Sequence, residues 1–231
     1  MSRPLFQLDQ RLALCASLVR TGVKLADIGT DHAYLPIWLA KQGKIMSAVA
    51  ADVREGPLKI AQENIQKYSV FQVSVRLSDG LRNIREEEAD DIVIAGMGGE
   101  LISRIIAETD WLKKKEKRLI LQPMTSVGEL RVALSDLGFT VLEEHAVWCG
   151  HHIYTAMQVS YYPDRSAKGE LFPYIGSLRL SESESRDYFR QQIKILEKRS
   201  AGLRLGGKRE EAENLSQICK KLCEMLGEEK L

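Results

Sequence analysis

The stretch Leu25-Ala26-Asp27-Ile28-Gly29-Thr30-Asp31-His32-Ala33-Tyr34 decides the fold, because it joins an apolar strand to a helix through a glycine turn. Residues 23–28 have the pattern of a short buried strand, and residues 34–41 that of a helix with Pro36 tolerated in its first turn. Gly29 permits a tight turn and leaves the backbone open to a ligand, since it has no Cβ. In an open parallel sheet, this turn adjoins the ligand crevice.

Strand and helix patterns alternate on both sides of this turn through the first 160 residues. The patterns predict strands at residues 23–28, 45–51, 71–77, 91–95, 118–121, 139–147 and 152–161, and helices at 8–19, 34–41, 57–68, 100–107 and 126–137. Repeated strand–helix units favour an α/β fold with about seven mostly parallel strands and helices on both faces. The last two strands have no crossover helix between them, so we expect an antiparallel pair at one edge.

The C-terminal segment follows a different pattern. Its apolar residues recur every three to four positions at Leu215, Ile218, Leu222 and Met225. An earlier amphipathic stretch from Ser183 onward is separated from this one by Gly206-Gly207. Two such stretches predict an antiparallel helical hairpin with a coiled-coil-like seam. We therefore predict two domains, a sheet domain at residues 1–162 and a helical domain at residues 163–231.

Composition limits the function classes. The 231 residues include 33 basic and 32 acidic side chains, a net charge of +1, which argues against nucleic-acid binding through the overall field but not through a local basic patch. No apolar run approaches the roughly 18 residues that would cross a membrane. The four cysteines are scattered and do not suggest a disulfide framework, and neither they nor the four histidines form a metal-ligand pattern. These features predict a cytoplasmic protein with neither a membrane partner nor a metal.

Carboxylates follow three successive strands. Asp27 and Asp31 flank the first turn, where a second glycine would be needed to hold a pyrophosphate, and Asp31 would repel one. Such carboxylates suit a ligand with a cationic amino-acid end. Asp52 ends the second strand and can accept the hydroxyls of a ribose, while Asp79-Gly80 either meets an adenine edge or forms a plain turn. The set fits S-adenosyl-L-methionine (SAM) better than NAD.

Glycines also follow the fourth strand, at Gly96-Met97-Gly98-Gly99. They would let the backbone press against both the cofactor and the target near the transferable methyl, although a plain strand-end loop reads the same way. No Asp/Asn-Pro-Pro-Tyr sequence is present, which argues against transfer to an exocyclic amine. Gln122-Pro123 closes the fifth strand and would line the same crevice.

The segments ADIGTDHAYLP, AADV, SDGL, IAGMGGELI and LQPM, in this order and spacing, resemble the bacterial TrmK family of tRNA (adenine-N1)-methyltransferases. The resemblance covers essentially the full chain, including the helical tail. It implies a class I SAM-dependent methyltransferase fold with a C-terminal helical domain, and a target adenine at position 22 in the D-arm of tRNA. Together with the carboxylates and glycines that follow the predicted strands, the resemblance predicts cofactor contacts at Asp27, Gly29, Thr30, Asp31, His32, Asp52, Val53, Asp79, Gly80, Gly96 and Gly98.

Methylation of adenine N1 needs alignment and stabilisation of a developing positive charge, because N1 is a neutral nucleophile. An acceptor for the N6 amine would serve both needs. Our catalytic candidates are therefore Asp31 and the backbone of Gly96, Met97 and Gly98. The target base must also leave its stack, so an aromatic platform is expected.

The predicted substrate contacts are of two kinds. Near the crevice they are Tyr34, Gln122, Pro123 and Tyr154, the two tyrosines being equally suited to a core. On the helical hairpin, tRNA phosphates would meet the basic residues Lys194, Lys198, Arg199, Arg204, Lys208 and Arg209. A further basic run at residues 113–118 reads more simply as a solvated face. The hairpin would bind RNA, or a second copy of the chain in a homodimer, or both. Two other functions remain open: a SAM-dependent small-molecule methyltransferase, and a non-catalytic nucleotide-binding or assembly protein.

Overall fold

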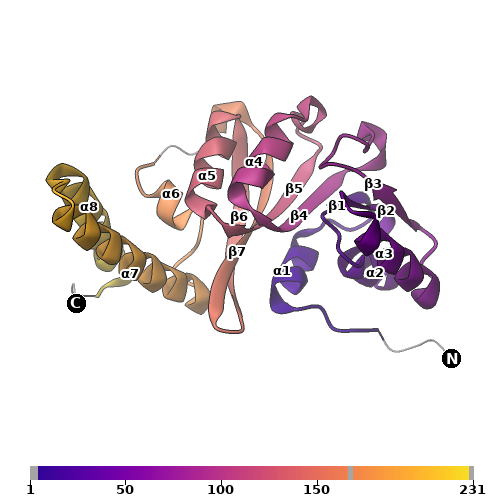
Figure 1. Cartoon of the computed structure of the whole chain (residues 1–231), viewed down its shortest axis with the longest axis horizontal. Coiled ribbons are helices and arrows are strands. Elements are labelled where there is room, and N and C mark those ends of the chain that lie inside the picture. The colour runs from indigo at the N-terminus through magenta and orange to yellow at the C-terminus, as the bar shows by residue number, and fades with distance from the viewer. Residues whose placement is uncertain (1–4, 166–168, 229–231) are drawn as a thin grey trace.

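The computed structural model describes residues 5–165 and 169–228 and contains one seven-stranded sheet in the order β3-β2-β1-β4-β5-β7-β6 (Figure 1). The strands are β1 (Val23–Ile28), β2 (Ile45–Asp52), β3 (Val73–Leu77), β4 (Asp91–Gly98), β5 (Arg118–Thr125), β6 (Phe139–Cys149) and β7 (His152–Tyr161). Neighbours from β3 to β5 are parallel, and β7 runs antiparallel to both β5 and β6. The predicted α/β fold with one reversed strand is confirmed, and the reversed strand is the last one, inserted between β5 and β6.

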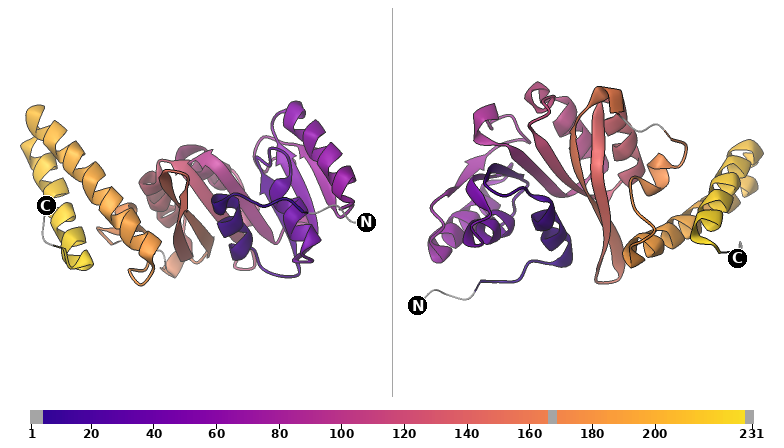
Figure 2. Two further views of the ribbon diagram at one scale, coloured as in Figure 1. Left: turned by 90° about the horizontal axis from the view of Figure 1, so that it is seen from below. Right: turned by 180° about the vertical axis from the view of Figure 1, so that it is seen from behind.

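Helices cover both faces of the sheet. The helices are α1 (Gln10–Leu18), α2 (Tyr34–Lys41), α3 (Glu55–Tyr68), α4 (Gly99–Ala107), α5 (Val127–Asp136), α6 (Phe172–Ile175), α7 (Ser183–Leu205) and α8 (Arg209–Leu226). One buried cluster joins α1, α2 and α3 to one face of the sheet, and a second joins α4 and α5 to the other (Figures 1 and 2). Leu25 belongs to the first cluster and Ala26 to the second, because neighbouring strand residues point to opposite faces. Both faces are buried, which explains the continuous apolar runs of the central strands.

Strands β4 and β5 extend further than the sequence pattern predicts. β4 was expected to end at residue 95 but continues through Gly96-Met97-Gly98, with an irregular register against β5. Gly96 has φ +76°, a left-handed conformation that only glycine adopts readily, and it introduces this irregularity without ending the pairing. The predicted strand-end loop is therefore wrong in part: its first three residues are the last residues of the strand.

The C-terminal helices form the predicted hairpin. α7 and α8 run antiparallel and extend away from the β6 edge of the sheet as an arm (Figure 2). Their seam buries Cys219 and Cys223, in agreement with a core role for these residues. The same cluster includes Ala146 of β6 and Ile153 of β7, so the base of the arm shares its core with the sheet. The predicted boundary between the two domains, between residues 162 and 163, stays a prediction. The outer ends of the two predicted domains, at residues 1 and 231, lie outside the described residues.

A buried ion pair joins the sheet to the arm. Arg131 of α5 and Glu144 of β6 are both fully enclosed, and the Arg131 Nη2 and Glu144 Oε1 atoms are 2.6 Å apart. Arg131 also donates to the carbonyl of Pro173 in α6, and Glu144 accepts from the backbone N–H of Ser177. The Arg131 guanidinium lies 5.6 Å from the centre of the Tyr188 ring in α7. The pair therefore holds the linker and the first turns of α7 against α5.

None of the helices within residues 5–165 and 169–228 has the length and apolar character needed to cross a membrane.

Candidate cofactor and acceptor site

The turn between β1 and α2 has an unusual backbone. Gly29 has φ +74°, and two non-glycine residues, Asp31 at +51° and Ala33 at +59°, are also left-handed. The N–H groups of Gly29 and Thr30 both donate to the carbonyl of Ala51, at 2.8 and 3.0 Å. These two hydrogen bonds fix the turn to the end of β2. Residues held in such conformations cost energy and are concentrated at functional sites. This turn is therefore a strained, well-anchored loop at the carboxyl edge of the sheet.

Gly29 lies directly against β4. A Cβ at Gly29 would overlap the Cε methyl of Met97. A side chain here would displace the flexible end of Met97 and would also be strained by the left-handed φ of +74°, so glycine suits this position. The structure thus brings together two predicted site segments that are 68 positions apart in the sequence.

Asp27 is a buried carboxylate at the end of β1. Burial raises its pKa to about 6, although a hydrogen bond donated by the Thr30 hydroxyl at 2.5 Å lowers the pKa and so opposes the rise. The charge of Asp52 raises the pKa further, so the two carboxylates influence each other. A cationic group placed here would compensate both charges, and this is the electrostatic environment that a positively charged ligand prefers.

Asp52 lies at the end of β2, beside the end of β3. It is buried, and its carboxylate accepts a hydrogen bond of 2.9 Å from the backbone N–H of Arg54. The backbone N–H of Ser78 donates to the Asp52 carbonyl, which sets the two strand ends side by side. Val53 follows with a 63% exposed side chain, an apolar surface beside a buried carboxylate. The carboxylate suits the ribose hydroxyls of a nucleoside, and the apolar surface suits the face of its base.

Asp79 and Gly80 form the third strand end. The Asp79 carboxylate pairs with Arg82 at 2.9 Å, and both side chains are well exposed. Gly80 has φ +57° and packs against Ile105. The residues therefore lie at the predicted edge of the sheet, with Arg82 as the present partner of the carboxylate.

Gln122 supports the end of β4. Its side chain is 1% exposed, its Oε1 accepts from the Gly96 N–H at 3.2 Å, and its Nε2 donates to the Pro123 carbonyl. We predicted that Gln122 contacts the substrate, but its amide is buried and committed to the backbone. Its geometry fits a positioning residue that fixes Gly96.

The two candidate aromatic platforms have different neighbours. Tyr34 is 38% exposed and makes edge contacts with Phe6 and His32. Tyr154 of β7 is half-buried, and the Arg11 guanidinium lies 5.4 Å from the centre of its ring. The structure therefore places Tyr154 beside Pro123 and Tyr34 at the start of α2.

His32 and Asp31 are the more exposed members of the turn. The His32 Nε2 lies 3.5 Å from the Asp31 carboxylate, and the His32 carbonyl accepts from the Asn64 amide. Asp31 has a 66% exposed side chain, so it is free to meet a ligand. In the described residues, no three His, Cys, Asp or Glu side chains are grouped as a metal site.

The basic candidates on the hairpin are all exposed. Arg204 pairs with Glu213 and Lys208 with Glu211. Lys194, Lys198 and Arg209 have no ion-pair partner in the part of the chain that the structure describes.

Several side chains of the basic run at residues 113–118 are engaged within the fold. Lys113 pairs with Asp110, Lys114 with Glu86, and Lys117 donates to two backbone carbonyls. This agrees with its interpretation as a structural surface.

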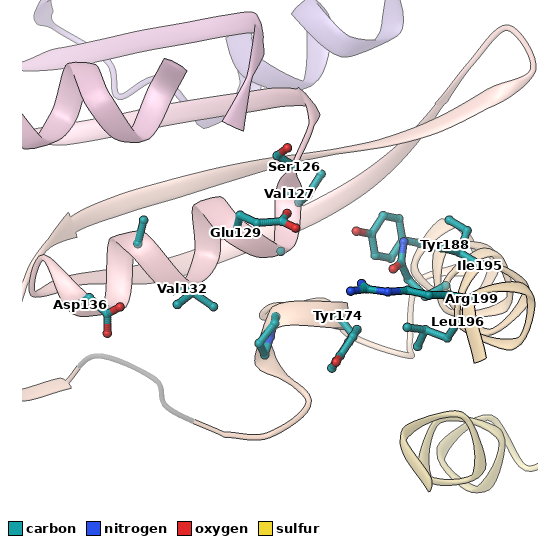
Figure 3. A pocket seen from close by; sticks show the side chains of 14 residues that line it. Ser126, Val127, Glu129, Val132, Asp136, Tyr174, Tyr188, Ile195, Leu196 and Arg199 are labelled. Atoms are coloured by element: carbon teal, nitrogen blue, oxygen red, sulfur yellow. The ribbon is translucent and has the colours of Figure 1, made fainter. Parts of the chain in front are cut away.

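Two hollows lie between the sheet and the arm. A groove of about 680 Å³ separates α5 from α7, with Glu129 and Val132 on one wall and Tyr188 and Arg199 on the other (Figure 3). A second cavity of about 330 Å³ lies next to it, between the ends of β5 and β7 and the first turns of α7. The sequence did not predict that the inner face of α7 lines these two hollows. The helical period of α7 shows that one face is buried, but it does not show which elements pack against that face.

Comparisons with known proteins show which family and which solved structures this chain resembles. Residues 8–157 match the family described as methyltransferase domain. The tRNA (adenine(22)-N(1))-methyltransferase of Bacillus subtilis is 40% identical over 60% of this chain, and the matched region spans 58% of that protein.

Two solved structures match nearly the whole fold. The putative tRNA (m1A22) methyltransferase of Streptococcus pneumoniae, in complex with S-adenosyl-L-methionine, is 31% identical, with a TM-score of 0.81 over 94% of this chain and 99% of that one. M. capricolum TrmK, in complex with S-adenosyl-homocysteine, is 28% identical, with a TM-score of 0.79 over 94% of this chain and 98% of that one.

Proposed function

This chain belongs to the TrmK family of class I methyltransferases, and we propose that it transfers the methyl group of SAM to N1 of the adenine at position 22 of tRNA. The observation that carries the proposal is the row of strand ends at one edge of the sheet. Asp27, Gly29 and Asp52 provide there a buried carboxylate, a tight turn fixed to the end of β2, and a second carboxylate for hydroxyl groups.

The residues present fit SAM. Asp27 and Asp31 suit the cationic amino-acid end, Asp52 the ribose, and Val53 a face of the adenine ring. When bound, SAM supplies an activated methyl group on a sulfonium. The Gly29 turn lies beside the Asp27 and Asp52 carboxylates, and its two N–H groups tie it to the end of β2.

Catalysis in this site rests on alignment. N1 of adenine attacks as a neutral base, so the chain needs no group that removes a proton before attack. The ring gains positive charge during transfer, and carbonyl dipoles or a carboxylate near the acceptor stabilise that charge. The Gly96–Gly98 backbone, fixed through Gln122, and the exposed Asp31 carboxylate are the groups we assign to this part.

The partner we propose is tRNA. Lys194, Lys198 and Arg209 on the arm are exposed and unneutralised in the described residues, which suits contacts to phosphates. A tRNA substrate implies a cytoplasmic enzyme. Near-neutral net charge then implies that binding depends on a small number of local contacts.

The test compares acceptors under the same conditions. Purified protein with methyl-labelled SAM is offered an unmodified tRNA transcript, the same transcript with guanine at position 22, and free adenosine. We expect transfer to the first alone. Transfer to free adenosine at a similar kcat/KM would favour the small-molecule alternative, and SAM binding without transfer would favour a non-catalytic protein.

A further inference from the structure

The cavity of about 330 Å³ beside the carboxyl edge has no part in holding SAM as described above. Its walls are Pro123 and Met124 of β5, residues 152–155 of β7, and Gln191 and Gln192 of α7. We propose that this cavity receives the flipped target adenine, and that Gln191 and Gln192 read its N6 and N7 atoms. The inference rests on the proposed function, because it deepens the acceptor side of the same site.

The order of the strands places the cavity next to the methyl donor. Met97 of β4 pairs with Pro123 of β5, and Met97 also lies against Gly29 of β1. Continuing the register Leu121–Met157 by two residues sets Thr155 beside Pro123. Neighbouring strands are about 4.8 Å apart, so the cavity wall lies one strand beyond Met97. The acceptor thus lies across β4 from the strand ends that suit SAM.

The cavity contains polar groups without partners. The Thr155 hydroxyl is buried and has no hydrogen-bond partner in the described part of the chain. The half-buried amides of Gln191 and Gln192 likewise make no side-chain hydrogen bond that the structure records within residues 5–165 and 169–228. Buried polar groups are normally paired, and leaving one unpaired destabilises the fold. One buried unpaired hydroxyl, with two half-buried amides lining the same cavity, favours a polar ligand.

The chemistry of the reaction selects which edge of adenine is read. N1 must face the methyl group, so the enzyme cannot cover the N1 atom itself. Recognition then falls on the N6 amine, which donates, and on N7, which accepts; a glutamine amide matches them with its oxygen and one N–H. Gln191 and Gln192 share the inner face of α7 with Tyr188, one helical turn earlier (Figure 3 shows Tyr188 on this face). A flipped base is also held by stacking, and Tyr154 is the aromatic side chain from the facing strand.

The placement on α7 gives the arm a second task. The Arg131–Glu144 pair fixes the first turns of this helix against α5. The arm would therefore complete the acceptor cavity, and its base would decide which nucleobase fits. This role is separate from phosphate binding along its length.

The first test removes N7 from the substrate. With a tRNA carrying 7-deazaadenosine at position 22, the wild-type kcat/KM should fall about tenfold, the loss expected for one good base contact. Gln191→Ala/Gln192→Ala should lose a similar factor on ordinary tRNA and lose little more on the 7-deaza substrate. Gln217→Ala, an exposed glutamine on α8, is the matched control and should behave as wild type. If the variant and the 7-deaza substrate instead lowered kcat/KM independently, so that their two factors multiplied, the assignment of Gln191 and Gln192 to N7 would be overturned.

The second test does not depend on methyl transfer. Full-length protein with labelled methionine methyl groups is saturated with S-adenosyl-homocysteine, so that adenosine monophosphate cannot enter the cofactor site. Adenosine monophosphate should shift the NMR signal of Met124 and leave that of Met225 on α8 unchanged; the double glutamine variant should abolish the shift. An unshifted Met124 signal would overturn the proposal that this cavity binds the target adenine. A shift in a protein that methylates no tRNA would instead count against the proposed function alone.

Discussion

Met97 lies over Gly29, and its Cε methyl occupies the space that a Cβ on Gly29 would need. This contact joins the turn after β1 to the end of β4, the two segments that carry most of the predicted site. Two features favour glycine at this position: its left-handed φ of +74° and the methionine methyl that packs against it.

We expect Gly29→Ala to lower the free energy of unfolding by about 2 kcal/mol, since the left-handed backbone alone costs about 1–2 kcal/mol for a residue with a Cβ. SAM affinity should fall at least about tenfold by calorimetry, because Met97 must move. Adding Met97→Ala relieves the overlap but leaves the backbone strain. Gly56→Ala is the control: its space is open and its φ is ordinary, so it should leave stability unchanged or slightly raised. Equal effects of the two glycine variants would contradict this account.

Asp27→Asn should stabilise the protein and weaken cofactor binding at the same time. The pKa of Asp27 rises from 3.8 to about 6 on folding, so the folded state holds this proton more tightly than the unfolded state. The contribution of Asp27 to the free energy of unfolding is therefore highest below about pH 4. This contribution falls by about 3 kcal/mol as the pH rises through 6.

Urea unfolding at pH 5 and pH 8 measures the upper half of this decline, about 1.4 kcal/mol. The asparagine variant should lose the decline and be more stable than wild type at pH 8, while SAM binding, which needs the carboxylate, weakens about tenfold or more. Wild-type SAM affinity should fall as the pH drops below 6. Asp110→Asn provides a contrast, since Lys113 lowers the pKa of Asp110 and the trend with pH has the opposite sign. A wild-type SAM affinity independent of pH between 5 and 8 would rule out Asp27 as the partner of a cation.

The buried pair of Arg131 and Glu144 should be costly to break. Arg131→Met leaves Glu144 without its partner in the interior, and we expect a loss of about 3–5 kcal/mol in urea unfolding. Removing both charges, as in Arg131→Met/Glu144→Leu, should cost less than the single change. Arg190→Ala, which breaks the half-exposed pairs with Glu228 and Asp187, should cost far less, because solvent screens these charges. A loss of similar size for the two pairs would contradict the interior role.

Phosphate binding by the arm predicts a change in salt dependence. Replacing Lys194, Lys198 and Arg209 by Gln should weaken tRNA binding at low salt and flatten the plot of log affinity against log salt by about 0.7–0.9 per lost contact. SAM affinity should stay unchanged. The same change at Lys113, Lys114 and Lys115 should have a smaller effect, since Lys113 and Lys114 already pair within the fold. Equal salt slopes for the two triple variants would place the phosphates elsewhere.

The fold could be read from local patterns because each strand–helix unit carries its own signals. The turn at Gly29 and the hairpin break at Gly206-Gly207 were both predicted, since glycine and helical periodicity act over a few residues. The continuation of β4 through Gly96 was missed, because a glycine at a strand end normally stops the strand. Here pairing with β5 continues past it.

The parts of the site that sequence could not supply depend on contacts between distant segments. Arg131 reads as a surface charge until β6 brings Glu144 to it. Gln122 reads as a crevice residue until the fold buries its amide against Gly96. The cavity formed by β7 and α7 is likewise invisible in either segment alone. The cofactor contacts themselves remain predictions, supported by the placement of the strand ends.

The activity proposed for this chain is methylation of N1 of one adenine in tRNA. Unmodified tRNA is incubated with the protein and methyl-labelled SAM, then digested and mapped by mass spectrometry. We expect 1-methyladenosine at position 22 and at no other position. A label on another nucleoside or at another position, or no label in any tRNA, would contradict it.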